Sequence, residues 1–198
     1  VALLVPENSP IKSIHDLKGK SVTANKGSIG HLITLRALEK AGLQPDDVHF
    51  KFLPPADGKL AVANGSVDVW AVWDPYTAYA ELKDHFRIIA NGRGLYSGYT
   101  FLAATDKSLQ NPEKRASIQD FVYRLKESQI WATSHSQEFG KQYAQITGLP
   151  EDVGTLAFKR RNASWEAIDQ QVIQTSQDTA DFYTKKAEFE HSQIQLLG

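Results

Sequence analysis

The chain has 198 residues, of which 41% are hydrophobic and 23% charged, so it can bury a core in one domain or in two small lobes. Its 22 Lys and Arg residues nearly balance its 23 Asp and Glu residues. The resulting net charge of −1 gives no general attraction to nucleic acid or to an anionic membrane. The absence of cysteine excludes disulfides, thiolate metal sites and cysteine nucleophiles.

The sequence contains no methionine and no apolar run approaching about 18 residues. We therefore expect no membrane span. We also expect that a segment preceding Val1, including any signal peptide, has been removed.

Short apolar stretches alternate with helical patterns over the first half of the sequence. Strands are predicted over 2–5, 21–24, 48–53, 67–73, 87–90 and 99–105. Capping and turn residues between them predict a short helix after Ser13 and longer helices over 28–41, 54–65 and 75–82. This alternation predicts an α/β fold with a mostly parallel sheet covered by helices on both faces.

From Asp106 onward the pattern is helical. Apolar residues recur at helical spacing over 118–132 and 165–183, and residues 136–147 form a third helix that ends at Gly148. These helices need an apolar partner, either one another or a sheet whose strands lie outside this sequence.

The stretch KGSIGH, residues 26–31, lies where a predicted strand gives way to a helix. The first N–H groups of a helix have no partner within it, and the helix dipole adds positive potential, so this position suits an oxyanion. Gly27 and the glycine at position 30 allow close approach of the main chain, Ser28 can cap or donate, and His31 lies in the first turn. The same residues also fit an ordinary N-cap.

The stretch GSVDVWAVWDPY, residues 65–76, holds two tryptophans three positions apart. On a strand such residues point to opposite faces, so one of Trp70 and Trp73 is expected to face a cleft. Asp74 precedes a proline at the carboxyl end of this strand, where open α/β sheets bind ligands. A buried tryptophan followed by a capping aspartate explains the pattern equally well.

Other polar residues give weaker signals. Tyr96 and Tyr99 lie among three glycines before the last predicted strand, which fits a cleft wall or a flexible turn. The histidines lack metal-ligand spacing, and no serine lies in a nucleophile elbow, so we expect neither a metal, nor a cofactor, nor catalysis.

Several phrases together resemble one protein family. They are VPENSPIKSIHDLKGKSV, KGS followed by histidine, ALEKAGL, FLPPAD and NGSVDVWAVWDPY with a following AxxE. They are similar to the aliphatic-sulfonate-binding proteins of ABC importers, which are related to taurine- and nitrate-binding proteins. The resemblance is dense from Val1 to about Glu81 and thinner afterwards.

The resemblance implies a type 2 periplasmic-binding-protein fold, in which two α/β lobes joined by hinge strands close over a small anion. Residues 1–5 and 99–105 would be the hinge strands, 6–98 one complete lobe, and 106–198 helices of the other, incomplete lobe. Family members carry further residues before the point where Val1 stands. We therefore expect a fragment, or a dimer in which two copies exchange parts.

The resemblance also implies a function outside the cytoplasm, in the periplasm. Main-chain N–H groups around Ser28 and Ile29 and the Ser28 hydroxyl would hold the sulfonate, with Gly27 and His31 beside them. Trp73 would shield the apolar tail, Asp74 would hold the hinge or the rim, and Tyr96 or Tyr99 would close the other side. The loaded protein would then dock on a membrane permease.

Two other functions fit the same scaffold. One is an enzyme of the desulfinase or pyrimidine-precursor synthase type. The desulfinase type relies on a cysteine nucleophile, so the absence of cysteine counts against it. The other is a ligand-sensing domain cut from a larger regulator.

Overall fold

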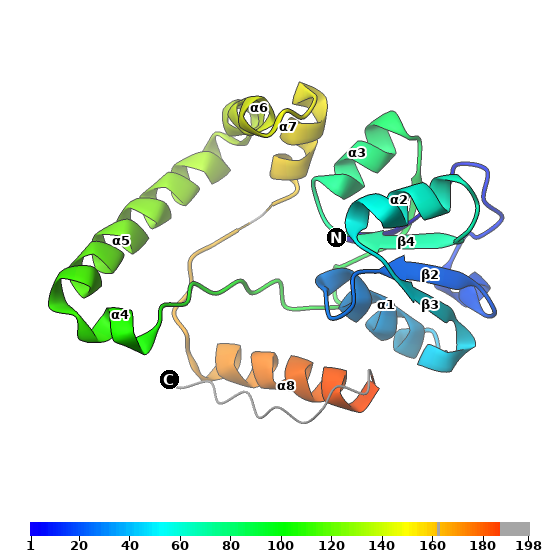
Figure 1. The fold of residues 1–198 in the computed structure, drawn as a ribbon, viewed down its shortest axis with the longest axis horizontal. Coiled ribbons are helices and arrows are strands. Elements are labelled where there is room, and N and C mark those ends of the chain that lie inside the picture. The colour runs from blue at the N-terminus through cyan, green and yellow to red at the C-terminus, as the bar shows by residue number, and fades with distance from the viewer. Residues whose placement is uncertain (162, 187–198) are drawn as a thin grey trace. The chain divides into compact units, whose positions relative to one another are not determined.

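The computed structural model describes residues 1–161 and 163–186, and the chain divides into two compact units (Figure 1). The first, here called the α/β unit, comprises residues 1–97 and the described residues from Asp169 onward. The second, here called the helical unit, comprises residues 98–168.

A five-stranded sheet forms the centre of the α/β unit. Its strands are β1 (Ala2–Val5), β2 (Ser21–Ala24), β3 (His49–Phe52), β4 (Val69–Val72) and β5 (Arg87–Asn91), in the order β3-β2-β4-β1-β5. β2 is parallel to β3 and β4, whereas β1 is antiparallel to β4 and β5. The sheet is therefore mixed, and the expectation of a mostly parallel sheet is wrong. Parallel and antiparallel strands in the centre of a sheet are both buried on two faces, so both appear in a sequence as apolar runs and their direction cannot be told apart.

Helices cover both faces of this sheet (Figure 1). They are α1 (Ile29–Lys40), α2 (Pro55–Ala63) and α3 (Tyr76–Lys83), with short 3₁₀ helices η1 (Ile14–Leu17) and η2 (Pro45–Asp47) between the strands. A further helix, α8 (Gln170–Lys186), packs on α1. On one face Ile33 and Leu38 of α1 pack on Leu3 and Val22. On the other face the side chains of α2 and α3 pack with Trp70 and its strand neighbours. Alternate residues of β1 and β4 thus contribute to two separate cores.

One edge of the sheet gathers the ends of β2, β3, β4 and β5 and the start of β1, and is here called the site edge. Because β2 and β4 are parallel and paired, Ala24 and Val72 end at the same edge. The antiparallel β1 brings Ala2 opposite both Val72 and Asn91, so the start of β1 and the end of β5 lie there too. Loops that follow β2, β4 and β5 therefore converge.

The helical unit contains α4 (Asp106–Gln110), α5 (Pro112–Ser134), α6 (Ser136–Thr147) and α7 (Glu151–Lys159). α6 and α7 pack closely, with the rings of Phe139 and Phe158 4.3 Å apart between centroids. A Cβ on Gly140 would lie 2.6 Å from the Thr155 Cα, so only glycine permits this approach. The sequence predicted α5 and α6 but not α7.

Two expectations differ from the structure. No strand forms over 99–105, because extended backbone becomes a strand only when a neighbour supplies hydrogen bonds, and none of the described strands pairs with it. The hinge role of this segment stays a prediction. Residues 106–198, expected as one helical part, are divided, because α8 belongs to the α/β unit. Within the described residues no helix is both long and apolar enough to cross a membrane.

Candidate anion-binding site

The start of α1 lies in a tight turn that follows β2. Ser28 is the N-cap, as predicted, with extended backbone angles and a side-chain oxygen that accepts from the His31 N–H at 3.4 Å. Its own N–H donates to the Asn25 carbonyl at 3.0 Å. Gly27 has a φ of +75°, which favours glycine at this turn. The loop is thus fixed by local bonds on both sides of Ser28.

These bonds decide which donors stay open to a ligand. The Gly27 N–H donates to the His31 Nδ1 at 3.4 Å, and the Ser28 N–H donates to the Asn25 carbonyl. Neither group is therefore open to a ligand, although the sequence suggested that N–H groups around Ser28 would be. The N–H groups of Ile29 and Gly30 have no hydrogen-bond partner among the described residues. With the Ser28 hydroxyl, whose oxygen accepts but whose hydrogen can still be donated, they form a set of three donors at the positive end of a helix.

Gly30 holds this donor set against the end of β4. A Cβ on Gly30 would overlap the carbonyl oxygen of Ala71 and lie 2.9 Å from its carbonyl carbon. The first turn of α1 therefore packs directly on the backbone two residues before Trp73. Ser28 and Trp73 consequently lie at the same edge of the sheet, as the proposed site requires.

Trp70 and Trp73 have different surroundings. Trp70 is buried, whereas Trp73 follows the end of β4 and is partly exposed. Both rings contact Tyr76, with centroids 6.1 Å and 6.3 Å apart, and both pack against the core beneath α2 and α3. The expectation of opposite faces is wrong, since the strand ends at Val72 and its alternation does not extend to residue 73. Tyr76, which the sequence analysis did not select, completes an aromatic wall with Trp73.

Asp74 and Tyr96 lie near each other at the site edge. The Asp74 Oδ1 accepts from the Ala78 N–H at 3.0 Å and so caps α3, which was one of the two predicted roles. Tyr96 folds over Gly92, just after β5. Burial, and secondarily the charge of Asp74, raise the pKa of Tyr96. A protonated tyrosine here can donate a hydrogen bond.

Tyr99 lies outside the α/β unit, just beyond its boundary at residue 97. It belongs to the helical unit, where its ring lies 6.3 Å from that of Phe101. Its role in closing the site stays a prediction.

His31 is buried beneath the loop rather than exposed beside the donors. Its ring lies edge-on to Phe50 and Phe52, with centroids 5.1 Å and 5.0 Å away, and 5.7 Å from Tyr183. Burial, and then the positive charge of Lys26, lower its pKa to about 4. The neutral ring accepts the Gly27 N–H through Nδ1, so His31 supports the loop. This contact with Tyr183 has no local signal in the sequence, because the two residues are far apart along the chain.

Within residues 1–161 and 163–186, no group of three or more His, Asp or Glu side chains is placed to hold a metal ion. The donor set at α1 is suited instead to an oxyanion, because it offers N–H and O–H groups.

Comparison with known proteins identifies similar chains. A family described as "ABC transporter, phosphonate, periplasmic substrate-binding protein" matches residues 1–149. A protein of Escherichia coli (strain K12), named for the binding of aliphatic sulfonates, is 36% identical over 183 residues, covering 91% of this chain and 56% of that protein. The chain spans about half the length of the curated relatives it matches.

Solved structures show the same fold. The alkanesulfonate-binding protein from Xanthomonas axonopodis pv. citri, bound to MOPS, is 32% identical with a TM-score of 0.84, covering 96% of this chain and 65% of that one. A desulfurization enzyme has a TM-score of 0.63 over 98% of this chain and 71% of its own, but at 17% identity it shares the fold alone. The predicted fold class, with one complete α/β lobe, is confirmed.

Proposed function

Because the chain belongs to the family of periplasmic substrate-binding proteins of phosphonate ABC transporters, we propose that it is the substrate-binding part of an importer for small sulfonates. The protein captures an aliphatic sulfonate reversibly in the periplasm and presents it to a membrane permease. The proposal draws on similarity to proteins named for sulfonate binding. It concerns a whole protein of the length of these relatives, about half of which this chain spans.

One observation carries the proposal. Three donors at the start of α1 lie at the same sheet edge as the partly exposed indole of Trp73, because Gly30 packs on Ala71. A sulfonate has a charged, oxygen-rich head, which suits the three donors, and an apolar tail, which suits the indole. A sulfonate is always ionised, so neutral dipoles suffice to hold it without a lysine. Binding would shift the protein toward a closed form that the permease recognises.

Binding is favoured over catalysis. The chain contains no cysteine that could act as a nucleophile of the desulfinase type, and its likeness to a desulfurization enzyme is limited to the fold. No described contact favours an enzyme or a regulator, so neither is proposed. Assembly of two copies by exchange stays a prediction, which the native mass of the purified chain would test.

The direct test is titration calorimetry on the full-length protein. Ethanesulfonate, hexanesulfonate and MOPS should each give saturable binding, and sulfate, which lacks an apolar tail, should bind more weakly. Methylphosphonate is the matched comparator, because the head has the same shape but a different charge. Binding of the phosphonate without any sulfonate would contradict the proposed substrate class, and no binding of either would contradict the site.

A further inference from the structure

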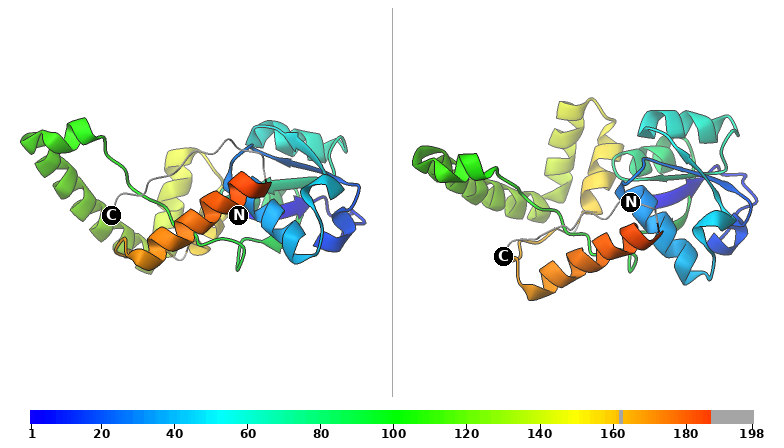
Figure 2. Two further views of the ribbon diagram at one scale, coloured as in Figure 1. Left: turned by 90° about the horizontal axis from the view of Figure 1, so that it is seen from below. Right: turned by 60° about the horizontal axis from the view of Figure 1, so that its bottom comes forward.

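The last described helix touches the anion-binding loop directly. The hydroxyl of Tyr183, on α8, donates to the carbonyl oxygen of Ser28 at 2.6 Å. The two residues are 155 positions apart in the sequence. Figure 2 shows the C-terminal end of α8 lying against α1.

The position of α8 on α1 is fixed by two further contacts. The Arg36 guanidinium lies 4.3 Å from the ring centroid of Phe182, and Lys186 pairs with Glu39 at 3.3 Å. These contacts surround Tyr183 in the sequence of α8, so its hydroxyl is held at one place.

The Ser28 carbonyl controls the orientation of one open donor. It accepts both the Tyr183 hydroxyl and the Leu32 N–H, the latter at 3.0 Å, and a carbonyl oxygen has two lone pairs for two such bonds. The peptide unit is planar, so the Ser28 carbonyl and the Ile29 N–H belong to one rigid plane. Fixing the carbonyl therefore fixes the direction of the Ile29 N–H.

Tyr183 also reaches the other support of the loop. Its ring lies 5.7 Å from that of His31, which accepts the Gly27 N–H. Burial raises the pKa of Tyr183, so its hydroxyl stays protonated and remains a donor. One side chain of α8 thus supports the loop on both sides of Ser28.

We infer that Tyr183 is a positioning residue for sulfonate binding, which orients the Ile29 N–H through the Ser28 carbonyl without touching the ligand. This inference rests on the proposed function. It assigns to α8 a role in affinity, beyond its role in covering α1.

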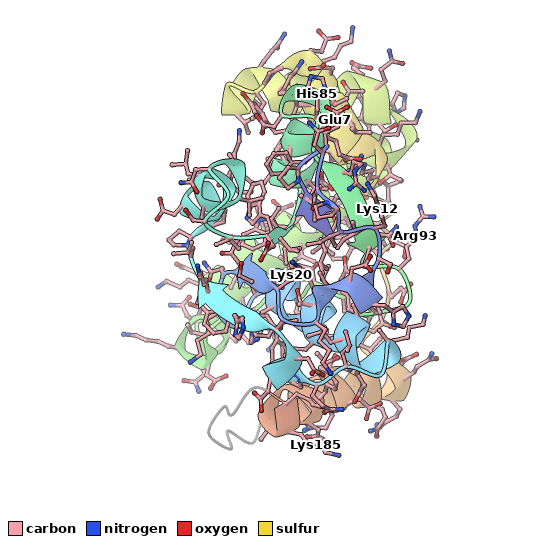
Figure 3. All side chains as sticks on the ribbon, turned by 90° about the vertical axis from the view of Figure 1, so that its right-hand side faces the viewer. Glu7, Lys12, Lys20, His85, Arg93 and Lys185 are labelled. Atoms are coloured by element: carbon pink, nitrogen blue, oxygen red, sulfur yellow. The ribbon has the colours of Figure 1, made fainter. Side chains whose placement is uncertain are left out.

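The test is Tyr183→Phe in the full-length protein, which removes the hydroxyl and keeps the ring. Loss of one neutral hydrogen bond should weaken hexanesulfonate binding about 3- to 10-fold by calorimetry. The amide resonance of Ile29 in the ligand-free protein should also move. Lys185→Ala is the matched control, because this side chain is exposed on the outer side of α8 (Figure 3), and it should change neither quantity.

A purely structural role gives a different result. Tyr183→Phe would then lower the unfolding temperature while the affinity and the Ile29 resonance stayed unchanged, which would overturn the inference and leave the proposed function standing. If the unaltered protein binds no sulfonate, both are overturned. A second measurement uses ¹³Cζ-labelled tyrosine, with Tyr183→Phe to assign the signal: hexanesulfonate should shift the Tyr183 resonance, and an unchanged resonance contradicts the inference.

Discussion

The imidazole of His31 lies edge-on to the ring of Phe52, with 5.0 Å between the ring centroids, in a buried aromatic cluster beneath the anion-binding loop. Charging this ring is unfavourable, because the cluster replaces water and Lys26 is near. The pKa of His31 is therefore lowered from 6.5 to about 4.

Stability should consequently fall in mildly acidic solution. The unfolded chain takes up the His31 proton first as the pH falls below 6.5, and the folded protein follows only near pH 4. The free energy of unfolding should decrease through this window by about 3 kcal/mol and then level off, since one pKa unit corresponds to about 1.4 kcal/mol. Urea unfolding at several pH values measures this slope. His31→Gln should reduce the dependence of the unfolding free energy on pH, whereas His15→Gln, at an exposed position, should leave this dependence unchanged. An equal slope in both variants would contradict its attribution to His31.

The close approach of α1 to β4 predicts a penalty for any side chain at residue 30. Gly30→Ala places a Cβ in the Ala71 carbonyl group, so α1 must shift away from the sheet. We expect a loss of about 1–3 kcal/mol in the free energy of unfolding, as for other overpacked positions, and weaker sulfonate binding. Chemical denaturation and calorimetry give the two quantities. Lys40→Ala, exposed on the same helix, should leave both unchanged; if Gly30→Ala does the same, the packing described here is incorrect.

The Ser28 side chain has two roles that a pair of substitutions separates. Ser28→Ala removes the N-cap, which should cost about 1 kcal/mol of stability. It also removes a donor to a charged ligand, which should weaken sulfonate binding by about 1.5–3 kcal/mol. Ser28→Thr keeps the hydroxyl and should retain most of both. If Ser28→Ala lowers the melting temperature without changing affinity, Ser28 is a cap and not a ligand.

Asp74 and Tyr96 are coupled electrostatically. Asp74→Asn keeps an oxygen that can accept the Ala78 N–H but removes the charge. The pKa of Tyr96 should fall and still stay above 10.0, because burial is the larger cause of its rise. Ultraviolet titration, with Tyr96→Phe to identify the signal, measures this change. An unchanged Tyr96 titration would show that the carboxylate does not act on the phenol.

The helical unit has its own sensitive contact. A Cβ on Gly154 would lie 2.7 Å from both the Ala144 Cβ and the Gly140 carbonyl oxygen. Gly154→Ala should destabilise the α6–α7 pair by about 1–3 kcal/mol. Amide hydrogen exchange should rise in α6 and α7 and stay unchanged in β1–β5. Gln145→Ala, exposed on α6, is the control, and equal exchange in both variants would refute the close packing.

The sequence by itself determined the features that depend on near neighbours along the chain. The strands β1–β5, the N-cap at Ser28 and the start of α1 were predictable, because apolar spacing and capping residues act within a few positions. The placement of Trp73 and Asp74 at the carboxyl end of β4 followed from the same local pattern.

Only the tertiary structure decided the direction of β1, the open donors and the support of the loop. Strand direction depends on hydrogen bonds between segments, which apolar runs do not encode. Whether an N–H is open depends on what lies opposite: the Gly27 N–H donates to His31, whereas that of Ile29 has no hydrogen-bond partner among the described residues. The bond from Tyr183 to Ser28 spans 155 positions, and such a contact forms only when distant segments of the chain pack together.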